Sequence, residues 1–194
     1  MLPKGFAALI KTAQDHDVSM RILEAVETAN DTRKRAMARK VSNAFGGVLR
    51  GKTVAVLGLT FKPNTDDMRE APSIPLITAL QDMGGTVRVY DPVGMEQAKQ
   101  VLADVTYCRG PYDCVEEADA VVIVTEWEQF RALDMERLRD LMACPVMIDL
   151  RNIYRPEDMK KHRFAYTCVG RASTYQPVSV YTRLGEAESL TPAL

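Results

Sequence analysis

The hydrophobic and polar positions of residues 6–45 follow a helical period, with apolar side chains recurring at steps of three and four residues. A Gly-Gly pair follows as a stop signal. The sequence DHDVS at 15–19 interrupts this pattern. We therefore expect a short first helix and a long second helix capped by Asp17 or Ser19. The second helix carries the basic run DTRKRAMARK, which indicates a solvated face, with anion binding as the alternative.

From residue 52 the pattern changes to an alternation of β-rich and helical segments. The segment AVVIVTEW at 120–127 is apolar over most of its length, which is typical of a strand buried on both faces. Strand–helix–strand repetition with short turns predicts parallel strands joined by right-handed crossovers. The predicted fold is an α/β, doubly wound parallel sheet of Rossmann-like type, preceded by a long helical segment. We predict strands at 52–61, 86–92, 105–108, 120–127, 145–151 and 164–170, and helices at 73–83, 94–103, 111–118 and 134–142.

These patterns divide the chain into three parts. The helical segment occupies residues 1–50, and the α/β domain occupies residues 51–171. Residues 172–194 lose the alternation and are rich in Ser, Thr and Pro, which predicts a mobile tail.

Composition narrows the class of protein. The net charge of −1 over 194 residues argues against a dedicated surface for nucleic acid or anionic membranes. No apolar run approaches the ~20 residues that span a bilayer, and the start of the chain lacks a signal-peptide pattern. The cysteines are scattered without a CxxC motif, and there are two histidines, so we expect neither a metal site nor a disulfide framework. We expect a cytoplasmic protein with reduced thiols. Cys114 falls in a predicted helix and Cys144 in a helix–strand turn, whereas Cys108 and Cys168 fall in strand-like runs, as small core residues.

Basic residues follow the predicted strands at the edge where such sheets bind ligands. Lys62 and Arg151 follow two different strands, and Arg69 lies just before a helix start. Cations that converge on one crevice suit a phosphate or diphosphate, to which arginine offers a two-point fork. The N-terminus of the following helix would add partial positive charge. The alternative is that these cations form ion pairs with nearby carboxylates, at Asp66, Asp67, Glu70 and Asp149.

The first of these loops, GLTFKPNTDDMREAPS at 58–73, differs from a dinucleotide-binding loop. It contains one glycine, Gly58, where the dinucleotide fingerprint has three. Asp91 could mimic the acid that binds ribose in such folds, but the missing glycines argue against an intact NAD site on this sheet. We therefore expect the loop to bind the phosphates of a nucleotide through its side chains.

Several ordered motifs resemble a known family. VAVLGLTFKPNTDDMREAPS, VYDP, VIVTEW and IDLRNIY resemble the C-terminal domain of the bacterial UDP-glucose 6-dehydrogenases. ALIKTAQDHDVSMRILEAVETANDTRKRAMARKV resembles the central helix of that family, so the likeness covers residues 6–171. The wider family includes GDP-mannose and UDP-N-acetylmannosaminuronate dehydrogenases.

The resemblance implies an N-terminal NAD-binding domain, a central helix that forms the dimer and a C-terminal domain that binds UDP. Family enzymes oxidise the sugar C6 alcohol twice with NAD, through a thiohemiacetal and a thioester on a cysteine. Carried over to this sequence, Lys62 and Arg151 resemble ligands of the UDP-sugar. Phe61 resembles a wall of the nucleotide pocket, with an ordinary core aromatic as the alternative. Arg69 resembles an arginine that reaches the NAD, and Lys4 resembles a lysine that contacts this cofactor.

The start of the chain departs from the family pattern Gly-Gly-x-Cys-Phe-Pro-Lys-Asp. In MLPKG, Met1 stands at the position of the cysteine and Gly5 at that of the aspartate. We therefore expect no catalytic residue, no NAD binding and no dehydrogenase activity from this chain alone, as in a truncated copy, a gene fragment or half of a split enzyme.

The expected function is that of the UDP-sugar-binding C-terminal part of a UDP-glucose 6-dehydrogenase, homodimeric through the long helix. One alternative is a free-standing nucleotide-sugar-binding or dimerising module. Another is a fragment of a dehydrogenase of the GDP-mannose or UDP-N-acetylmannosamine type. An unrelated flavodoxin-like or nucleotide-binding domain is the third.

Overall fold

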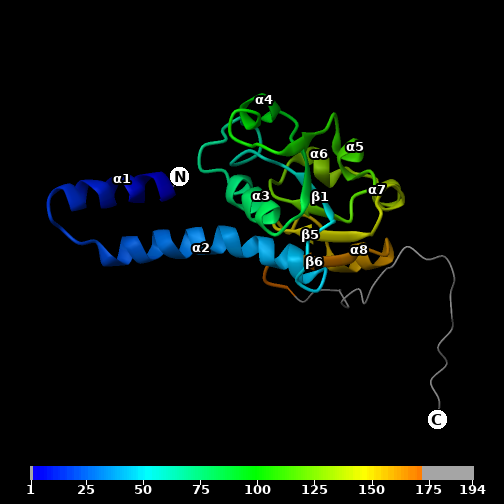
Figure 1. The fold of residues 1–194 in the computed structure, drawn as a ribbon, viewed down its shortest axis with the longest axis horizontal. Helices are drawn as coiled ribbons and strands as arrows, with labels where there is room; N and C mark the ends of the chain where they lie inside the picture. The colour runs from blue at the N-terminus through cyan, green and yellow to red at the C-terminus, as the bar shows by residue number, and fades with distance from the viewer. Residues whose placement is uncertain (1, 172–194) are drawn as a thin grey trace, which may run out of the picture.

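A helical hairpin leads into an α/β domain (Figure 1). The computed structural model describes residues 2–171, without the side chains of residues 2–4, 7 and 35. Met1 and the predicted tail at 172–194 lie outside the described residues. Helix α1 (Leu2–Asp15) runs back alongside the long helix α2 (Arg21–Asn43), whose C-terminal end reaches the domain (Figure 1).

The domain is built on six parallel strands in the order β3-β2-β1-β4-β5-β6. The strand order reverses between β1 and β4, which pair in parallel with Leu57 opposite Ile123. The predicted doubly wound sheet is thereby confirmed, and the observed strands are shorter than the predicted ones. Their bounds are β1 Thr53–Leu57, β2 Thr86–Tyr90, β3 Val105–Tyr107, β4 Ala120–Ile123, β5 Val146–Asp149 and β6 Ala165–Cys168.

Helices cover both faces of the sheet (Figure 1). The helices α6 and α8 were not predicted, because each buries one residue, Phe130 and Met159 respectively, and so shows no repeated apolar pattern. No helix within residues 2–171 has the length and apolar character needed to cross a membrane. The helices are α3 Ser73–Asp82, α4 Met95–Ala98, α5 Pro111–Val115, α6 Glu128–Arg131, α7 Met135–Leu141 and α8 Pro156–Lys161.

The break between α1 and α2 lies where the sequence predicts it, but the predicted cap is wrong. The N-cap of α2 is Met20, which makes no side-chain cap hydrogen bond. Asp17 instead adopts a left-handed backbone conformation, with φ of 55°, in the turn that follows α1. An aspartate tolerates this conformation because its short polar side chain can bond locally.

Residues of each strand alternate between two separate cores. In β1, Val54 and Val56 pack in the core beneath α2 and α3, whereas Ala55 and Leu57 pack against the helices on the opposite face. The C-terminal half of α2 belongs to the first of these cores, so the long helix and the sheet share one apolar interior. Its fully or almost fully buried contributors are Ala38, Val41 and Ala44.

A buried carboxylate, Asp91, joins the loops at the point where the strand order reverses. Its side chain is 1% exposed. Its Oδ2 accepts hydrogen bonds from the backbone of Leu59 (2.7 Å) and Thr60 (3.2 Å), from Thr60 Oγ1 (3.3 Å) and from Trp127 Nε1 (3.1 Å). Its Oδ1 accepts two backbone N–H groups of the turn after β2, at 2.8 and 3.0 Å. This carboxylate therefore ties together the segments that follow β1, β2 and β4.

A second buried carboxylate, Asp149, shapes the loop after β5. Its Oδ1 accepts a hydrogen bond from the backbone of Arg151 (2.9 Å), and its Oδ2 accepts from the backbone of Tyr154 (3.0 Å) and the hydroxyl of Tyr166 (2.8 Å). Burial and the charge of Asp149 raise the pKa of Tyr166, so its hydroxyl stays protonated and donates to the carboxylate. These bonds fix the backbone that carries Arg151.

The ends of β1 and β4 approach closely at Gly58. This glycine has φ of 90°, and a Cβ there would lie 2.6 Å from both the backbone nitrogen and the Cβ of Thr125. Thr125 is itself held by a hydrogen bond from its Oγ1 to the carbonyl of Thr60 (2.7 Å). The glycine that opens the first loop is therefore required for packing between strand ends.

Replacing Gly58 by alanine should strongly destabilise the domain. The matched control is Gly51→Ala, because Gly51 also has a positive φ, of 76°, but has no atom within 4 Å of its added Cβ. The control should lose about 1–2 kcal/mol from backbone strain alone, and Gly58→Ala should lose about 3 kcal/mol or more because overpacking adds to that strain. Urea denaturation measures both changes. Equal losses would show that the close approach to Thr125 costs nothing.

Replacing Asp91 by asparagine should lower the free energy of unfolding by about 2–3 kcal/mol. Whichever way the amide is oriented, its Nδ2 would meet at least two N–H donors that now reach an oxygen. Asp82→Asn is the control, since Asp82 is exposed at the end of α3. Chemical denaturation of the two variants checks the difference, and an Asp91→Asn midpoint equal to that of the control would contradict this role.

Candidate functional site

A cleft of about 320 Å³ opens at the carboxyl edge of the sheet, where ligands of open α/β sheets bind. It lies between α2, the start of α3 and the residues that follow β4, β5 and β6. Its lining combines apolar residues with an amide and three cationic side chains. The lining residues are Asn30, Arg33, Lys34, Met37, Pro72, Leu76, Val124, Leu150, Arg151 and Val169.

The helix α2 contributes two of the three cations of the cleft, Arg33 and Lys34. The ammonium of Lys34 lies 3.2 Å from Asp31 on its own helix and 3.5 Å from Glu70 in the loop after β1. The pair with Glu70 links the long helix to that loop. The sequence favoured a solvated face for this basic run, with anion binding as the alternative; the structure gives two of its residues to the cleft wall.

Arg151 lies in the cleft, as the sequence predicts for a residue after β5, but its guanidinium is already paired. It forms a two-point interaction with the carboxylate of Glu126, in which Nη2 lies 2.6 Å from Oε1 and Nε donates to Oε2. Burial alone would raise the pKa of Glu126, but the hydrogen bonds and charge of Arg151 outweigh burial, and the net pKa lies below its ordinary value. An anion that binds Arg151 must therefore share or displace this carboxylate.

Asn152 fixes the backbone next to Arg151. Its side chain donates to the carbonyl of Val169 (3.0 Å) and accepts from the Val169 backbone N–H (3.1 Å). This paired contact ties the loop after β5 to the residue that follows β6. Two of the strand ends that line the cleft are thus held in register by one amide side chain.

Phe61 and Lys62 lie on the loop after β1 and do not belong to the described lining of this cleft. Phe61 is half-buried and packs against the core beneath α2 and α3, which is the arrangement of a strand-end core aromatic. Lys62 is exposed, and within residues 2–171 no carboxylate forms an ion pair with its ammonium. The structure therefore leaves the Lys62 cation open to solvent.

Arg69 lies apart from Arg151, in a second, carboxylate-lined depression of about 490 Å³. Its guanidinium binds both oxygens of Asp67, at 2.8 and 2.9 Å, and its side chain is 79% exposed. The hydrogen bonds and charge of Asp67 raise the pKa of Arg69 further above its ordinary value. The alternative of ion pairing with a local carboxylate thus describes Arg69, whereas Arg151 pairs with Glu126, a partner that the sequence did not indicate.

One predicted site residue remains to be placed, Lys4. Lys4 lies in α1, but its side chain is outside the described residues. Among the residues that the structure describes, no group of three or more His, Cys, Asp or Glu is arranged to hold a metal ion.

The loop after β1 does not fit the diphosphate of a dinucleotide. Such a site needs a short glycine-rich turn that leads directly into a helix N-terminus. Here Gly58 packs against Thr125, and α3 begins only at Ser73. Asp91, the candidate ribose-binding acid, is buried and its oxygens already accept six hydrogen bonds from the protein. The loop after β1 and Asp91 therefore lack the arrangement of a glycine-rich dinucleotide loop with a free ribose-binding acid.

The sequence could not have grouped Arg33 and Lys34 with Arg151. Basic residues on a helix carry no local signal that separates a solvated face from a cleft wall. Their position depends on the packing of α2 against α3, and contacts between those helices are established only in the folded chain.

Comparisons with known proteins identify relatives of this chain. The UDP-glucose 6-dehydrogenase of Rhizobium meliloti is 54% identical over 169 residues, which cover 87% of this chain and 39% of that protein. The UDP-glucose 6-dehydrogenase of Pseudomonas aeruginosa is 41% identical over 175 residues, with the same coverage of both chains. The chain thus spans about 39% of the length of these curated relatives.

A solved structure and a family description point the same way. A UDP-glucose dehydrogenase from the hyperthermophilic archaeon Pyrobaculum islandicum matches 76% of this chain and 32% of its own length, with a TM-score of 0.65 and 36% identity. Residues 55–156 match the UDP binding domain of the UDP-glucose/GDP-mannose dehydrogenase family. Because that match covers more than half of the 194 residues, the chain belongs to the UDP-glucose/GDP-mannose dehydrogenase family and carries its UDP binding domain.

Proposed function

We propose that the chain is the nucleotide-sugar-binding part of a UDP-glucose 6-dehydrogenase, the enzyme class that oxidises UDP-glucose to UDP-glucuronate. The observation that carries this proposal is the cleft at the carboxyl edge of the sheet, where Arg33, Lys34 and Arg151 share the lining with apolar residues. Apolar walls with a few convergent polar groups suit a small ligand with a flat base and a charged diphosphate. The dehydrogenase activity belongs to the whole protein.

Two cations would contact the diphosphate: Arg151 in the cleft, and Lys62 on the loop after β1, outside the described lining of the cleft. Arg151 offers a planar fork that matches two phosphate oxygens, and Lys62 offers a point charge without a carboxylate partner among the described residues. Phe61 stands beside Lys62 and would form an apolar boundary to the ligand. Glu126 competes with the ligand for Arg151, so the affinity of the chain for UDP should be modest.

We assign NAD to a different domain of the whole protein. Arg69 is exposed on the loop after β1 and would reach a cofactor held by that domain, and Lys4 would do so from α1. The four free thiols of the chain favour a reducing, cytoplasmic compartment.

We also propose that the chain forms a homodimer through the α1–α2 hairpin. Ile22 on α2 is 80% exposed, Leu9 on α1 is 47% exposed and Val18 between the helices is 56% exposed. The hairpin projects beyond the sheet (Figure 1), and these side chains pack in neither of the two cores of the domain. Large exposed apolar surfaces typically mark an association site.

Calorimetric titration with UDP should show weak binding that depends on Lys62 and Arg151. Each charge-assisted hydrogen bond contributes about 1.5–3 kcal/mol, so Lys62→Ala and Arg151→Ala should each weaken binding by about tenfold or more. Arg155→Ala is the control that removes the same charge from an exposed residue that lies neither in the described lining of the cleft nor on the loop after β1. Binding that all four proteins share equally would contradict these assignments.

Light scattering should give a dimer mass for the chain at tens of micromolar. Ile22→Asp should shift the mass toward the monomer, because a carboxylate would have to be buried without a partner in the contact. Val48→Asp is the matched control, since Val48 is 62% exposed but lies outside the hairpin. A monomer mass for the unchanged chain, or an equal shift in both variants, would refute an interface through α2.

A further inference from the structure

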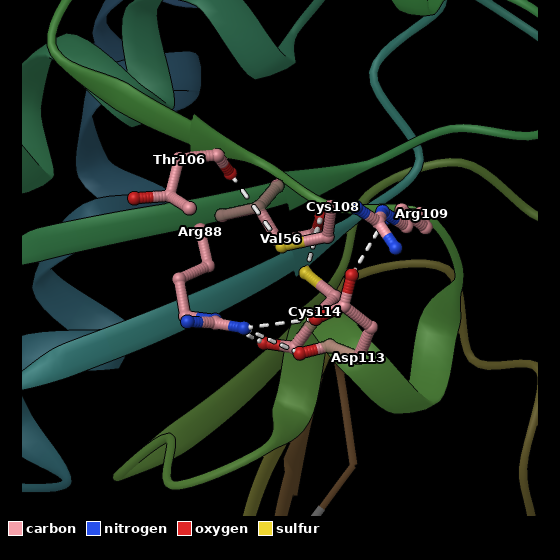
Figure 2. Close-up of polar contacts among 7 residues, drawn as sticks. All are labelled: Val56, Arg88, Thr106, Cys108, Arg109, Asp113 and Cys114. Atoms are coloured by element: carbon pink, nitrogen blue, oxygen red, sulfur yellow. Dashed lines mark hydrogen bonds and ion pairs between the residues drawn. The ribbon is translucent and has the colours of Figure 1, made fainter.

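Two cysteines far from the cleft form a close pair at the carboxyl end of β3. Cys108 directly follows that strand, and Cys114 lies on α5. Figure 2 shows their sulfur atoms side by side; the Cys108 thiol donates to the carbonyl of Thr106 (3.6 Å) and the Cys114 thiol to the carbonyl of Val56 (4.0 Å). Both are free, and they are 5% and 0% exposed respectively.

Hydrogen bonds fix the backbone around both cysteines. The short turn between them is closed by Asp113, whose Oδ2 accepts the backbone N–H of Arg109 (2.7 Å). Arg88 on β2 binds the carbonyl groups of Asp113 (2.6 Å) and Cys114 (3.1 Å), as Figure 2 shows. The backbone of Cys108 donates to β2 through the Val89 carbonyl (3.0 Å). The backbone of both cysteines is therefore connected by hydrogen bonds to β2.

The surroundings make the two thiols chemically different. The neighbouring thiol of Cys114, the charge of Arg88 and the backbone of Val89 lower the pKa of Cys108 to about 7, against the opposing effects of burial and of Asp113. Burial raises the pKa of Cys114, and its contact with Cys108 raises it further. Near neutral pH the pair thus combines a thiolate with a neighbouring protonated thiol, and the thiolate is the reactive form of cysteine.

We propose that Cys108 and Cys114 are an oxidation site for hydroperoxides, at which Cys108 is the attacking thiolate and Cys114 the resolving thiol. The sulfur of Cys108 attacks one peroxide oxygen, the O–O bond breaks, and Cys108 becomes a sulfenic acid while the leaving oxygen takes a proton from solvent. Cys114 then attacks that sulfur, the S–O bond breaks and water leaves with the proton of Cys114. One peroxide is reduced and two thiols become one disulfide, which a dithiol reductant reverses.

The other two cysteines provide a contrast within the same chain. Cys168 is 1% exposed in β6, and Cys144 lies in the turn before β5, with its sulfur 4.0 Å from Asp119 Oδ1. A nearby carboxylate disfavours a thiolate. These two residues serve as internal references for the reactivity of Cys108.

The test treats the whole chain with hydrogen peroxide, blocks the remaining thiols with an alkylating reagent and maps the peptides by mass spectrometry. We expect loss of two hydrogens, a Cys108–Cys114 disulfide, reversal by dithiothreitol and reduced Cys144 and Cys168. The initial rate should rise with pH around a midpoint near 7, as the Cys108 thiolate forms beside Cys114, Arg88, Arg109 and Asp113.

Two variants separate the steps. Cys114→Ala should stop at the sulfenic acid of Cys108, which dimedone traps, whereas Cys108→Ala should leave Cys114 reduced. Circular dichroism checks that both variants are folded. Because the unchanged chain is tested first, the proposal does not depend on either variant. It is overturned if Cys108 stays reduced at a peroxide dose that oxidises free cysteine, or if Cys144 or Cys168 reacts as fast.

Discussion

The buried carboxylate of Asp91 is the interaction on which the organisation of this domain depends. It accepts bonds from the loop after β1, from the turn after β2 and from Trp127 after β4, and no cation is paired with it among the described residues. A charge with 1% exposure is tolerated inside a protein only when hydrogen bonds replace its water. The strand ends at the switch point are therefore held at fixed positions, and with them the loop that carries Lys62.

Two cations of the candidate site are paired with carboxylates. In the cleft, Arg151 binds Glu126 and Lys34 binds Asp31 and Glu70; outside the cleft, Arg69 binds Asp67. Such pairing keeps a cluster of cations from destabilising the fold when no anion is bound. It also means that recognition of a diphosphate would be an exchange of partners, in which cations leave carboxylates for phosphate oxygens. Binding should then be selective for ligands that offer more than one acceptor.

Prediction from sequence succeeded where the signal is local and failed where it is not. The apolar runs of β1 and β4 and the repeated strand–helix order identified the doubly wound sheet, because strands buried on both faces need continuous apolar sequence. The helix α8 was missed because it buries one residue, Met159, and so shows no repeated apolar pattern. The cap of α2 was assigned wrongly because several polar residues precede the helix, and only the backbone shows that Met20 occupies that position.

The sequence by itself determined the fold class, the family motifs and the cationic candidates after β1 and β5. Only the tertiary structure decided which of these cations share a cleft. It grouped Arg151 with Arg33 and Lys34 of α2 and left Arg69 in a separate depression. The physical reason is that the periods of strands and helices depend on residues close together in the sequence. The pairing of Arg151 with Glu126 and of Cys108 with Cys114 instead arises from the packing of separate elements around one sheet.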